Sequence, residues 1–232
     1  VLGAAIAGCV LTEWAFTPAD NRRERLLDGS GVLTGLLLGL TLPPGLPLWM
    51  AFVGGAVSIG LGKLIWGGLG QNLFNPALVG RAFLLATFPT AMTTWIPAGG
   101  PGDFFKVYAS NLAAPFMHVD YDGVSSATPL GRMKFEQLDT PLSDLLVGNV
   151  SGCLGETSGL LLLLGGVYLL WRRVIDWRIP ASILIAVAAF SGLLYTLGPD
   201  KYPGPLFSIF SGGLLIGAFY MATDPVSSPM TP

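Results

Sequence analysis

Six long apolar runs, almost free of charged side chains, constrain this chain more than any other feature of its sequence. They cover residues 1–16, 31–61, 76–97, 145–171, 179–198 and 206–222. Several reach the ~20 apolar residues that an α-helix needs to cross a bilayer. Charged residues make up 11% of the chain, against about 25% in an average soluble domain. One such run fits a soluble core, but six predict an all-α polytopic membrane protein, with residues 1–232 forming a single integral-membrane domain.

Charge and cysteine content exclude two classes of protein. The chain has a net charge of −2, which argues against nucleic-acid binding, because that function requires a basic face. Cys9 and Cys153 lie in apolar segments, where we expect buried free thiols. Two cysteines are fewer than the four thiolates of an ordinary iron–sulfur cluster, so we expect no such cluster on this chain alone. The chain starts inside an apolar run without an initiator Met, and we expect it to be part of a longer polypeptide.

Basic residues predict the orientation in the membrane. Three arginines at 22–25 follow the first apolar run, and three more at 172–178 follow run 145–171. Short basic loops mark the cytoplasmic side. The long segment 96–144 carries more acidic than basic residues, and we expect it to form one long external loop.

Two pairs of segments resemble each other within the chain. Residues 78–89 align with 214–225, with Ala-Phe, Ala-Thr and Pro in register, and residues 34–38 resemble 158–162. In the predicted topology the members of a pair enter the membrane from opposite sides, which is typical of an inverted repeat. Chance similarity between two Leu-rich stretches is the alternative.

Prolines and glycines interrupt the apolar runs. Residues 42–47, Leu-Pro-Pro-Gly-Leu-Pro, cannot continue a helix, because proline removes a donor and clashes with the preceding turn. The segment is either a broken helix, whose carbonyls must then face protein or a wet cavity, or a plain external turn. Asn75 and Pro76 have the residue types of an N-cap and a first helical position.

One polar segment resembles a flavin-attachment motif. Residues 122–130 read Asp-Gly-Val-Ser-Ser-Ala-Thr-Pro-Leu, similar to D-x-x-[ST]-[GS]-A-T, in which the Thr hydroxyl carries FMN through a phosphoester bond. Residues 70–83 and 221–229 are similar to two further signatures of one family. That family comprises the D subunit of the Rnf ferredoxin:NAD oxidoreductase complex and the B subunit of the sodium-pumping NADH:quinone reductase. An unmodified loop is the alternative for the motif alone.

The resemblance implies a cofactor, partners and a location. Covalent FMN would be carried by Thr128, with Asp122, Ser125, Ser126 and Ala127 completing the attachment motif, which a separate flavin transferase reads. A second, non-covalent flavin, riboflavin, is associated with the membrane part of the family. Partners would be membrane and peripheral subunits that carry iron–sulfur clusters and flavin, together with membrane lipid. The location would be the bacterial inner membrane, with the flavin-bearing loop on the periplasmic side.

Three carboxylates near the ends of apolar runs are candidates for an ion path. Asp28, Glu156 and Asp224 occupy positions where ionisable groups are costly and usually functional or paired, and hard cations prefer oxygen ligands. Na⁺ and H⁺ are both open. The alternatives are helix capping for Glu156, capping of the chain end for Asp224 and neutralisation of Arg25 by Asp28.

Two basic residues complete the set of candidates. Arg81 is a lone guanidinium in an apolar run; it either extends to the membrane surface or holds a flavin or a carboxylate. His118 receives no role, because a lone histidine is a poor metal site.

The sequence leaves three functions open. The first is a membrane electron-transfer subunit in a complex that couples ferredoxin or NAD(H) redox chemistry to ion movement, similar to the D subunit of the Rnf complex. The B subunit of the sodium-pumping reductase is the second. A passive channel or solute transporter built on the same repeat is the third, because fold alone does not settle function.

Overall fold

The computed structural model describes residues 1–97, 107–115, 117, 126–199 and 201–228. All secondary structure in these residues is helical, as expected for a helical membrane protein. The chain divides into two compact units, Val1–Ile96 with Gly102–Ser125 and Pro97–Pro101 with Ser126–Pro232. The boundary therefore falls within the segment predicted as the external loop.

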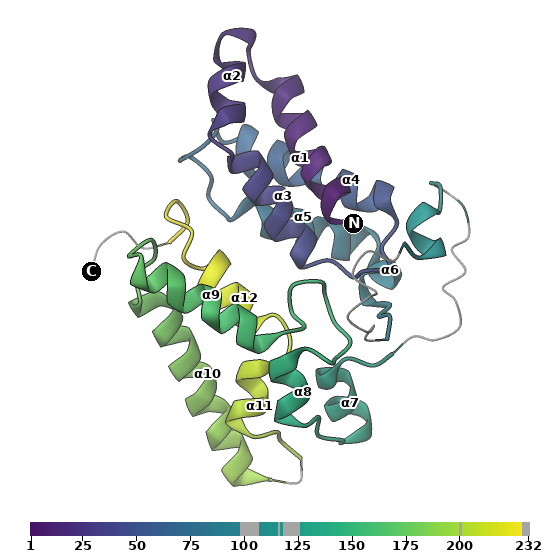
Figure 1. The fold of residues 1–232 in the computed structure, drawn as a ribbon, viewed down its shortest axis with the longest axis vertical. Coiled ribbons are helices and arrows are strands. Elements are labelled where there is room, and N and C mark those ends of the chain that lie inside the picture. Colours follow the sequence, from purple (N-terminus) through teal and green to yellow (C-terminus); the bar gives the residue numbers. More distant parts are fainter. Residues whose placement is uncertain (98–106, 116, 118–125, 200, 229–232) are drawn as a thin grey trace. The chain divides into compact units, whose positions relative to one another are not determined.

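The first unit is built around helix α1, which packs against α3 and α4, while α4 also packs against α5 (Figure 1). Its helices are α1 (Leu2–Phe16), α2 (Ala19–Leu27), α3 (Ser30–Leu40), α4 (Leu48–Ile59), the π-helix η1 (Gly60–Leu64), α5 (Pro76–Thr87), α6 (Pro89–Thr93) and the short 3₁₀-helix η3 (Ala109–Leu112). Asn75 caps α5 as predicted, because its Oδ1 accepts from Ala77 N at 3.0 Å and Pro76 follows.

Glycines allow these helices to approach closely. A Cβ added at Gly35 of α3 would lie 2.5 Å from Ile6 Cα of α1, and one added at Gly54 of α4 would lie 2.5 Å from Leu84 Cδ1 of α5. Small residues at such crossings are how helices pack in a membrane, where apolar burial provides little driving force between them.

The segment between α3 and α4 is buried, which argues against a plain external turn. Leu42 and Leu46 have no exposed surface. The Asn111 side chain donates from Nδ2 to Pro44 O at 2.9 Å and to Leu46 O at 2.8 Å. Arg81 Nη1 donates to Thr41 O at the C-terminus of α3. Three carbonyls of the segment, those of Thr41, Pro44 and Leu46, are therefore bound by protein side chains, in agreement with the broken-helix interpretation.

The second unit contains the 20-residue helix α10, the 13-residue helix α9 and several shorter helices. They are α7 (Pro129–Glu136), α8 (Leu142–Val147), α9 (Gly159–Trp171), α10 (Arg178–Leu197), α11 (Pro205–Phe210), α12 (Leu214–Ile216) and the π-helix η4 (Gly217–Met221), which continues α12. Helix α11 packs against α8 and α10, and α12 packs against α9.

Three expected segments differ from the structure. Apolar run 145–171 is interrupted by the turn 148–158, where Gly148 has φ 99°. Run 206–222 is interrupted at residues 211–213, where Gly212 has φ 66°. The segment 96–144 contains α7 and the start of α8 rather than loop alone. Hydropathy indicates which residues avoid water. The interruptions instead occur where a glycine adopts the left-handed backbone conformation, which few other residues tolerate.

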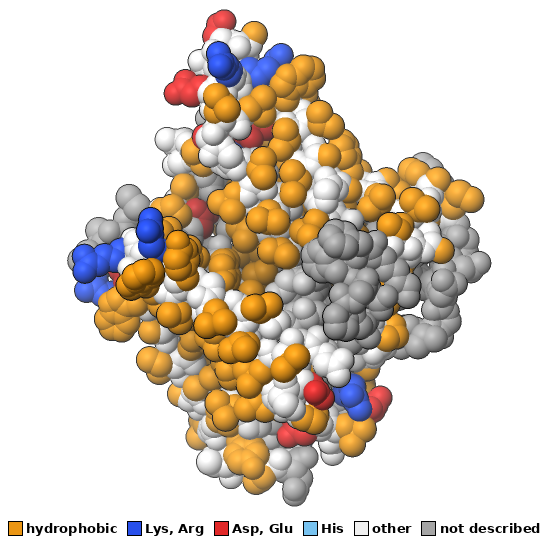
Figure 2. Space-filling model, in the orientation of Figure 1, with side chains coloured by type: hydrophobic (Ala, Val, Ile, Leu, Met, Phe, Trp, Pro, Cys, Tyr) orange, Lys and Arg blue, Asp and Glu red, His pale blue; other side chains and the backbone are white. Residues whose placement is uncertain are grey.

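Among the described residues, one helix, Arg178–Leu197, is long and apolar enough to cross a membrane by length and composition. Five shorter apolar helices of 10–17 residues accompany it, at Leu2–Phe16, Ser30–Leu40, Leu48–Leu64, Pro76–Thr87 and Gly159–Trp171. Large apolar side chains of α9 and α10 are exposed, including Leu161, Leu164, Ile185, Phe190 and Leu193. Figure 2 shows such side chains over the visible face, with charged side chains gathered in a few places. Surfaces of this kind require a lipid or protein partner.

The two π-helices reveal a further internal similarity. Residues 47–55, Pro-Leu-Trp-Met-Ala-Phe-Val-Gly-Gly, match residues 205–213, Pro-Leu-Phe-Ser-Ile-Phe-Ser-Gly-Gly. In the first unit the helix continues through both glycines, whereas in the second it breaks there. Each segment then enters a π-helix, η1 or η4, at nearly the same distance from its proline. The π-helix η4 lies within residues 214–225, which also align with 78–89, so for that part of the chain the two pairings are alternatives.

Candidate functional site

Thr128 lies at the N-terminus of α7, with its side chain partly exposed. Its Oγ1 accepts a hydrogen bond from Gly131 N at 3.1 Å, and Pro129 occupies the first helical position. Thr128 is therefore an N-cap residue, followed by the proline that favours a helix start. This arrangement holds the hydroxyl at the helix end, outside the body of the helix.

Ser126 connects the Thr128 segment to the turn 148–158. Ser126 Oγ and Ser151 Oγ are 2.8 Å apart and share a hydrogen bond, and Ser151 is buried. Leu130, in the first turn of α7, packs at the helix break, because a Cβ added at Gly212 would lie 2.9 Å from Leu130 Cδ1. The threonine segment, the turn and the break, which are far apart in the sequence, therefore meet within the second unit.

Glu156 belongs to the same cluster. It is partly buried in the turn 148–158, and a methyl group at Gly213 would lie 2.6 Å from its Oε1. Gly213 is the residue before α12, so the carboxylate lies beside the N-terminus of the α12–η4 helix, where negative charge is favourable. Helix α9, which follows Glu156, is capped instead by Ser158, whose Oγ accepts from Leu161 N at 3.4 Å. Glu156 therefore lies beside the N-terminus of α12, while Ser158 caps α9.

Asp28 and Asp224 each hold a local turn. Asp28 Oδ1 accepts from Ser30 N at 2.7 Å and from Ser30 Oγ at 2.5 Å. Asp224 accepts from Val226 N at 3.2 Å and from Ser227 Oγ at 3.1 Å. Asp28 lies in the first unit, and Glu156 and Asp224 lie in the second. Their role in an ion path remains a prediction.

The remaining sequence candidates take an unexpected role or lie outside the described residues. Arg81 binds the C-terminus of α3 through Thr41 O, a favourable position for a cation and a role that the sequence did not suggest. Asp122 and Ser125 of the attachment motif and His118 lie outside the described residues.

Sequence reasoning missed a buried ion pair in the first unit. Lys63 of η1 donates from Nζ to Glu13 Oε1 in the last turn of α1, and the side chains are 2% and 1% exposed. Lone charges inside or just after apolar runs were the signal that could have identified both residues. The pairing itself depends on how α1 packs against η1.

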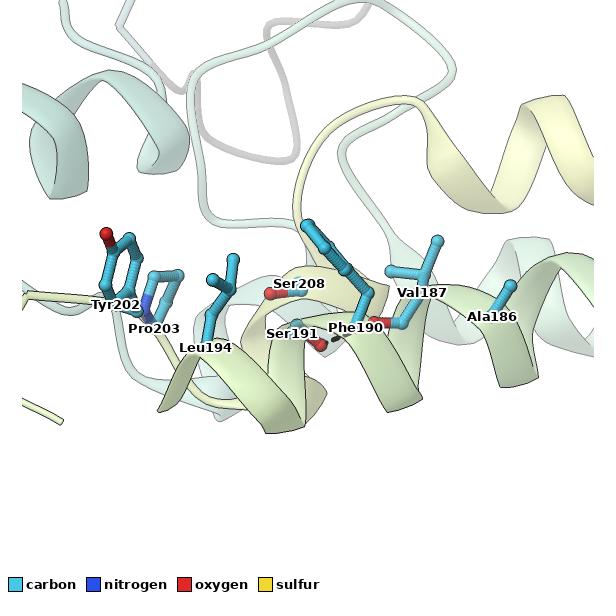
Figure 3. Close-up of a pocket in the computed structure, with 8 residues that line it drawn as sticks. All are labelled: Ala186, Val187, Phe190, Ser191, Leu194, Tyr202, Pro203 and Ser208. Carbon is cyan, nitrogen blue, oxygen red and sulfur yellow. Dashed lines mark hydrogen bonds between the residues drawn. The ribbon is translucent and has the colours of Figure 1, made fainter. Parts of the chain in front are cut away.

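A cavity of about 420 Å³ lies along α10 in the second unit, lined by side chains of this helix such as Phe190 and Leu194 and by Tyr202, Pro203 and Ser208 of the segment that follows it (Figure 3). Ser191, which also lines the cavity, donates from Oγ to Val187 O of the same helix at 2.6 Å. None of the candidate residues lines this cavity. No group of three His, Cys, Asp or Glu side chains that could hold a metal ion occurs among the described residues.

Comparisons with known proteins agree with the sequence signatures. The chain is 44% identical over 223 residues to the D subunit of the ion-translocating oxidoreductase complex of Stutzerimonas stutzeri, covering 90% of this chain and 62% of that protein. It is 40% identical to the protein of the same name from Yersinia enterocolitica, covering 98% and 70% of the two chains. It is 38% identical to the D subunit of the proton-translocating ferredoxin:NAD(+) oxidoreductase complex of Clostridium ljungdahlii, covering 100% and 67%.

The chain thus spans about two thirds of the length of these relatives. The model of one family matches it over residues 1–232. Together with the helical fold, the match over the whole chain and the identities above 30% show that the chain belongs to the NQR2, RnfD, RnfE family.

Proposed function

We propose that this chain is a membrane electron-transfer subunit that carries FMN on Thr128, within a complex that couples ferredoxin and NAD(H) redox chemistry to ion translocation. The observation that carries the proposal is the position of Thr128. Thr128 is partly exposed at a helix start, next to the turn that bears Glu156 and the break before α12. The relatives described above are D subunits, which favours this role over that of the B subunit of the sodium-pumping reductase.

The residues at Thr128 fit a phosphoester. Esterification removes the hydroxyl proton of Thr128. The contact with Gly131 N does not need this proton, because Oγ1 is the acceptor. A phosphate there would lie at the N-terminus of the eight-residue helix α7, where the helix dipole and free N–H groups favour negative charge. Arg132 and Lys134 in the same helix are basic and at least partly exposed. When bound, FMN would supply one- and two-electron transfer, and the protein would position it.

Electrons must reach this chain from partners. With two cysteines, the chain has fewer thiolates than an ordinary iron–sulfur cluster needs. We propose that other subunits of the complex carry such clusters and further flavin, and that a flavin transferase loads Thr128. Riboflavin in the membrane part, the bacterial inner membrane as location and the external side for Thr128 belong to the same proposal.

The attachment is tested by in-gel fluorescence of the denatured protein. Thr128→Ala should abolish covalent flavin fluorescence, whereas Thr128→Ser, which keeps both hydroxyl and cap, should retain part of it. Ser143→Ala removes an exposed hydroxyl in the same unit and should leave fluorescence at the wild-type level. Undiminished fluorescence in Thr128→Ala would refute the assignment. Loss of the N-cap in that variant costs roughly 0.5–2 kcal/mol, so the amount of inserted protein is measured alongside.

A further inference from the structure

The cavity along α10 lies on the one helix of the described residues that is long and apolar enough to cross a membrane. Its lining residues come from α10 and from the segment after that helix, namely Ala186, Val187, Phe190, Ser191, Leu194, Tyr202, Pro203 and Ser208. In Figure 3 they follow one another from Ala186 at one end to Leu194, Pro203 and Tyr202 at the other. Ala186 and Phe190 are exposed, so the cavity is a groove that is open to the surroundings of the helix.

The groove offers little to a polar ligand or to water. Ser191 Oγ donates to Val187 O of its own helix at 2.6 Å. Ser208 Oγ donates to Gly204 O at 3.3 Å, so both hydroxyl protons are used within the chain. Apart from Tyr202, the other lining residues are apolar. An ordered water needs about two to four polar partners, and a polar ligand buried without hydrogen bonds loses free energy. An apolar occupant therefore fits the groove best.

The length and depth of the groove match one leaflet of a bilayer. α10 has 20 residues, which extend over about 30 Å, and this is the thickness of the hydrocarbon core. Ala186 lies close to the middle of this span, and Leu194 lies about 5 Å from its C-terminal end. With α10 across the bilayer, the groove runs along the acyl chains, from near the bilayer centre to one surface. In the orientation predicted from the basic loops, that surface is the external one.

Polar groups lie at the end of the groove where α10 stops. Lys201 N and Tyr202 N both donate to Gly198 O, at 3.1 and 3.0 Å, and this turn returns the chain to the helix end. The Lys201 ammonium is 5.6 Å from the centre of the Tyr202 ring, and Lys201 is exposed. Tyrosine and lysine are typical of the membrane surface, where the ring lies among the headgroups and the ammonium reaches water. Asp200, the residue before Lys201, lies outside the described residues.

The polar end decides which lipid the groove prefers. The apolar walls discriminate little, because the acyl chains of every phospholipid are as apolar as leucine. A basic side chain near an anionic lipid surface contributes an attraction that corresponds to about a fivefold preference. The charge of Lys201 therefore favours a lipid with a net negative headgroup over a zwitterionic one.

We propose that the groove binds one acyl chain of an anionic phospholipid from the leaflet on the Lys201 side. The Lys201 ammonium and the Tyr202 hydroxyl donate to the phosphate oxygens, while the acyl chain fills the groove as far as Ala186. The site is separate from Thr128, and the inference goes beyond the proposed function, because it requires neither the flavin nor electron transfer.

Photo-crosslinking tests the site in the assembled complex. The complex is reconstituted in phosphatidylcholine nanodiscs with a minor fraction of phosphatidylglycerol that carries a diazirine, either at the end of one acyl chain or next to its carbonyl group. Mass spectrometry of the peptides identifies the crosslinked residues. The chain-end probe should label residues 186–190, and the carbonyl probe should label residues 194–203. Labelling in the reverse order of depth, or no labelling because a helix of another subunit fills the groove, would overturn the proposal.

A matched pair of variants tests whether the lipid lies in the groove itself. Ala186→Phe fills the inner end of the groove and should abolish labelling of residues 187–190 by the chain-end probe. Ala189→Phe places the same side chain at an exposed position of α10 that does not line the groove, and labelling should remain at the wild-type level. Equal labelling in the two variants would mean that the probe reports only the general lipid surface of α10, and the proposal would be wrong.

A second set of variants tests the headgroup. Lys201→Gln should lower the preference for phosphatidylglycerol over phosphatidylcholine with the same diazirine about fivefold, whereas Lys201→Arg, which keeps the charge, should retain it. Arg178→Gln removes an exposed charge at the opposite end of α10 and should leave labelling of residues 194–203 unchanged. An unaltered preference in Lys201→Gln would refute the anionic headgroup.

Discussion

Asn111 should hold the broken segment between α3 and α4 in place. Its side chain donates to Pro44 O and Leu46 O and accepts from Tyr108 N at 3.0 Å. Asn111→Ala leaves the buried carbonyl of Leu46 and the partly buried carbonyl of Pro44 without these donors, and each unsatisfied buried group costs roughly 1–3 kcal/mol. Allowing for partial relaxation, we expect the opening of the first unit to become easier by about 3–4 kcal/mol.

Thiol labelling measures this change, because Cys9 is buried where α1 packs against α4. In a Cys153→Ser background Cys9 is the remaining thiol, and it reacts only when the helices separate. Since about 1.4 kcal/mol corresponds to a factor of ten, Asn111→Ala should label Cys9 roughly 10²- to 10³-fold faster at constant reagent concentration.

A matched control separates this effect from the loss of any asparagine. Asn21→Ala changes an exposed residue on α2 and should alter the opening free energy by no more than about 0.5 kcal/mol. If Asn111→Ala accelerates labelling by less than about fivefold, or about 1 kcal/mol, the carbonyls find other partners and the role assigned to Asn111 is wrong.

Three further outcomes are expected. Gly35→Ala should destabilise the first unit by about 1–3 kcal/mol in the same labelling assay, because the new methyl meets the backbone of α1. Gly3→Ala, with nothing within 4 Å of the added Cβ, should be neutral or stabilising. Equal effects of the two variants would refute the close-packing argument. Arg81→Met removes the donor to Thr41 O and should lower the thermal midpoint more than Arg81→Lys does, with the reverse order contradicting the role at the end of α3. A cysteine in place of the exposed Lys134 should react with an impermeant reagent added from outside intact cells, and labelling only after disruption would reverse the predicted orientation.

A local signal predicted the start of α5, because Asn75, followed by proline, caps that helix as expected. Thr128 is also followed by proline and caps α7, a helix that was not expected in this segment. Helix α10 follows its apolar run almost residue for residue. These features depend on a few neighbouring residues, which a single sequence displays.

Interruptions and long-range pairs were beyond the same reasoning. Gly148 and Gly212 adopt positive φ inside runs of uniform hydropathy, and the sequence does not show which of many glycines will do so. The Glu13–Lys63 pair spans fifty positions of the chain, and Asn111 reaches Pro44 from a segment with no apolar period. Such contacts depend on tertiary packing, which local propensity does not encode.

The exposure of α10 has a consequence for how this chain can diverge. Pro180 and Ser191 are its buried residues, while Phe190 and Leu197 are 65% and 74% exposed. A side chain that faces fluid acyl chains needs no complementary shape, so leucine, isoleucine and phenylalanine can replace one another there at little cost. A charge at the same position is costly wherever it lies in the bilayer core. Substitutions along α10 should therefore accumulate freely among apolar residues while the polarity of each position stays fixed, and identity counted letter by letter will underestimate how closely two such helices are related.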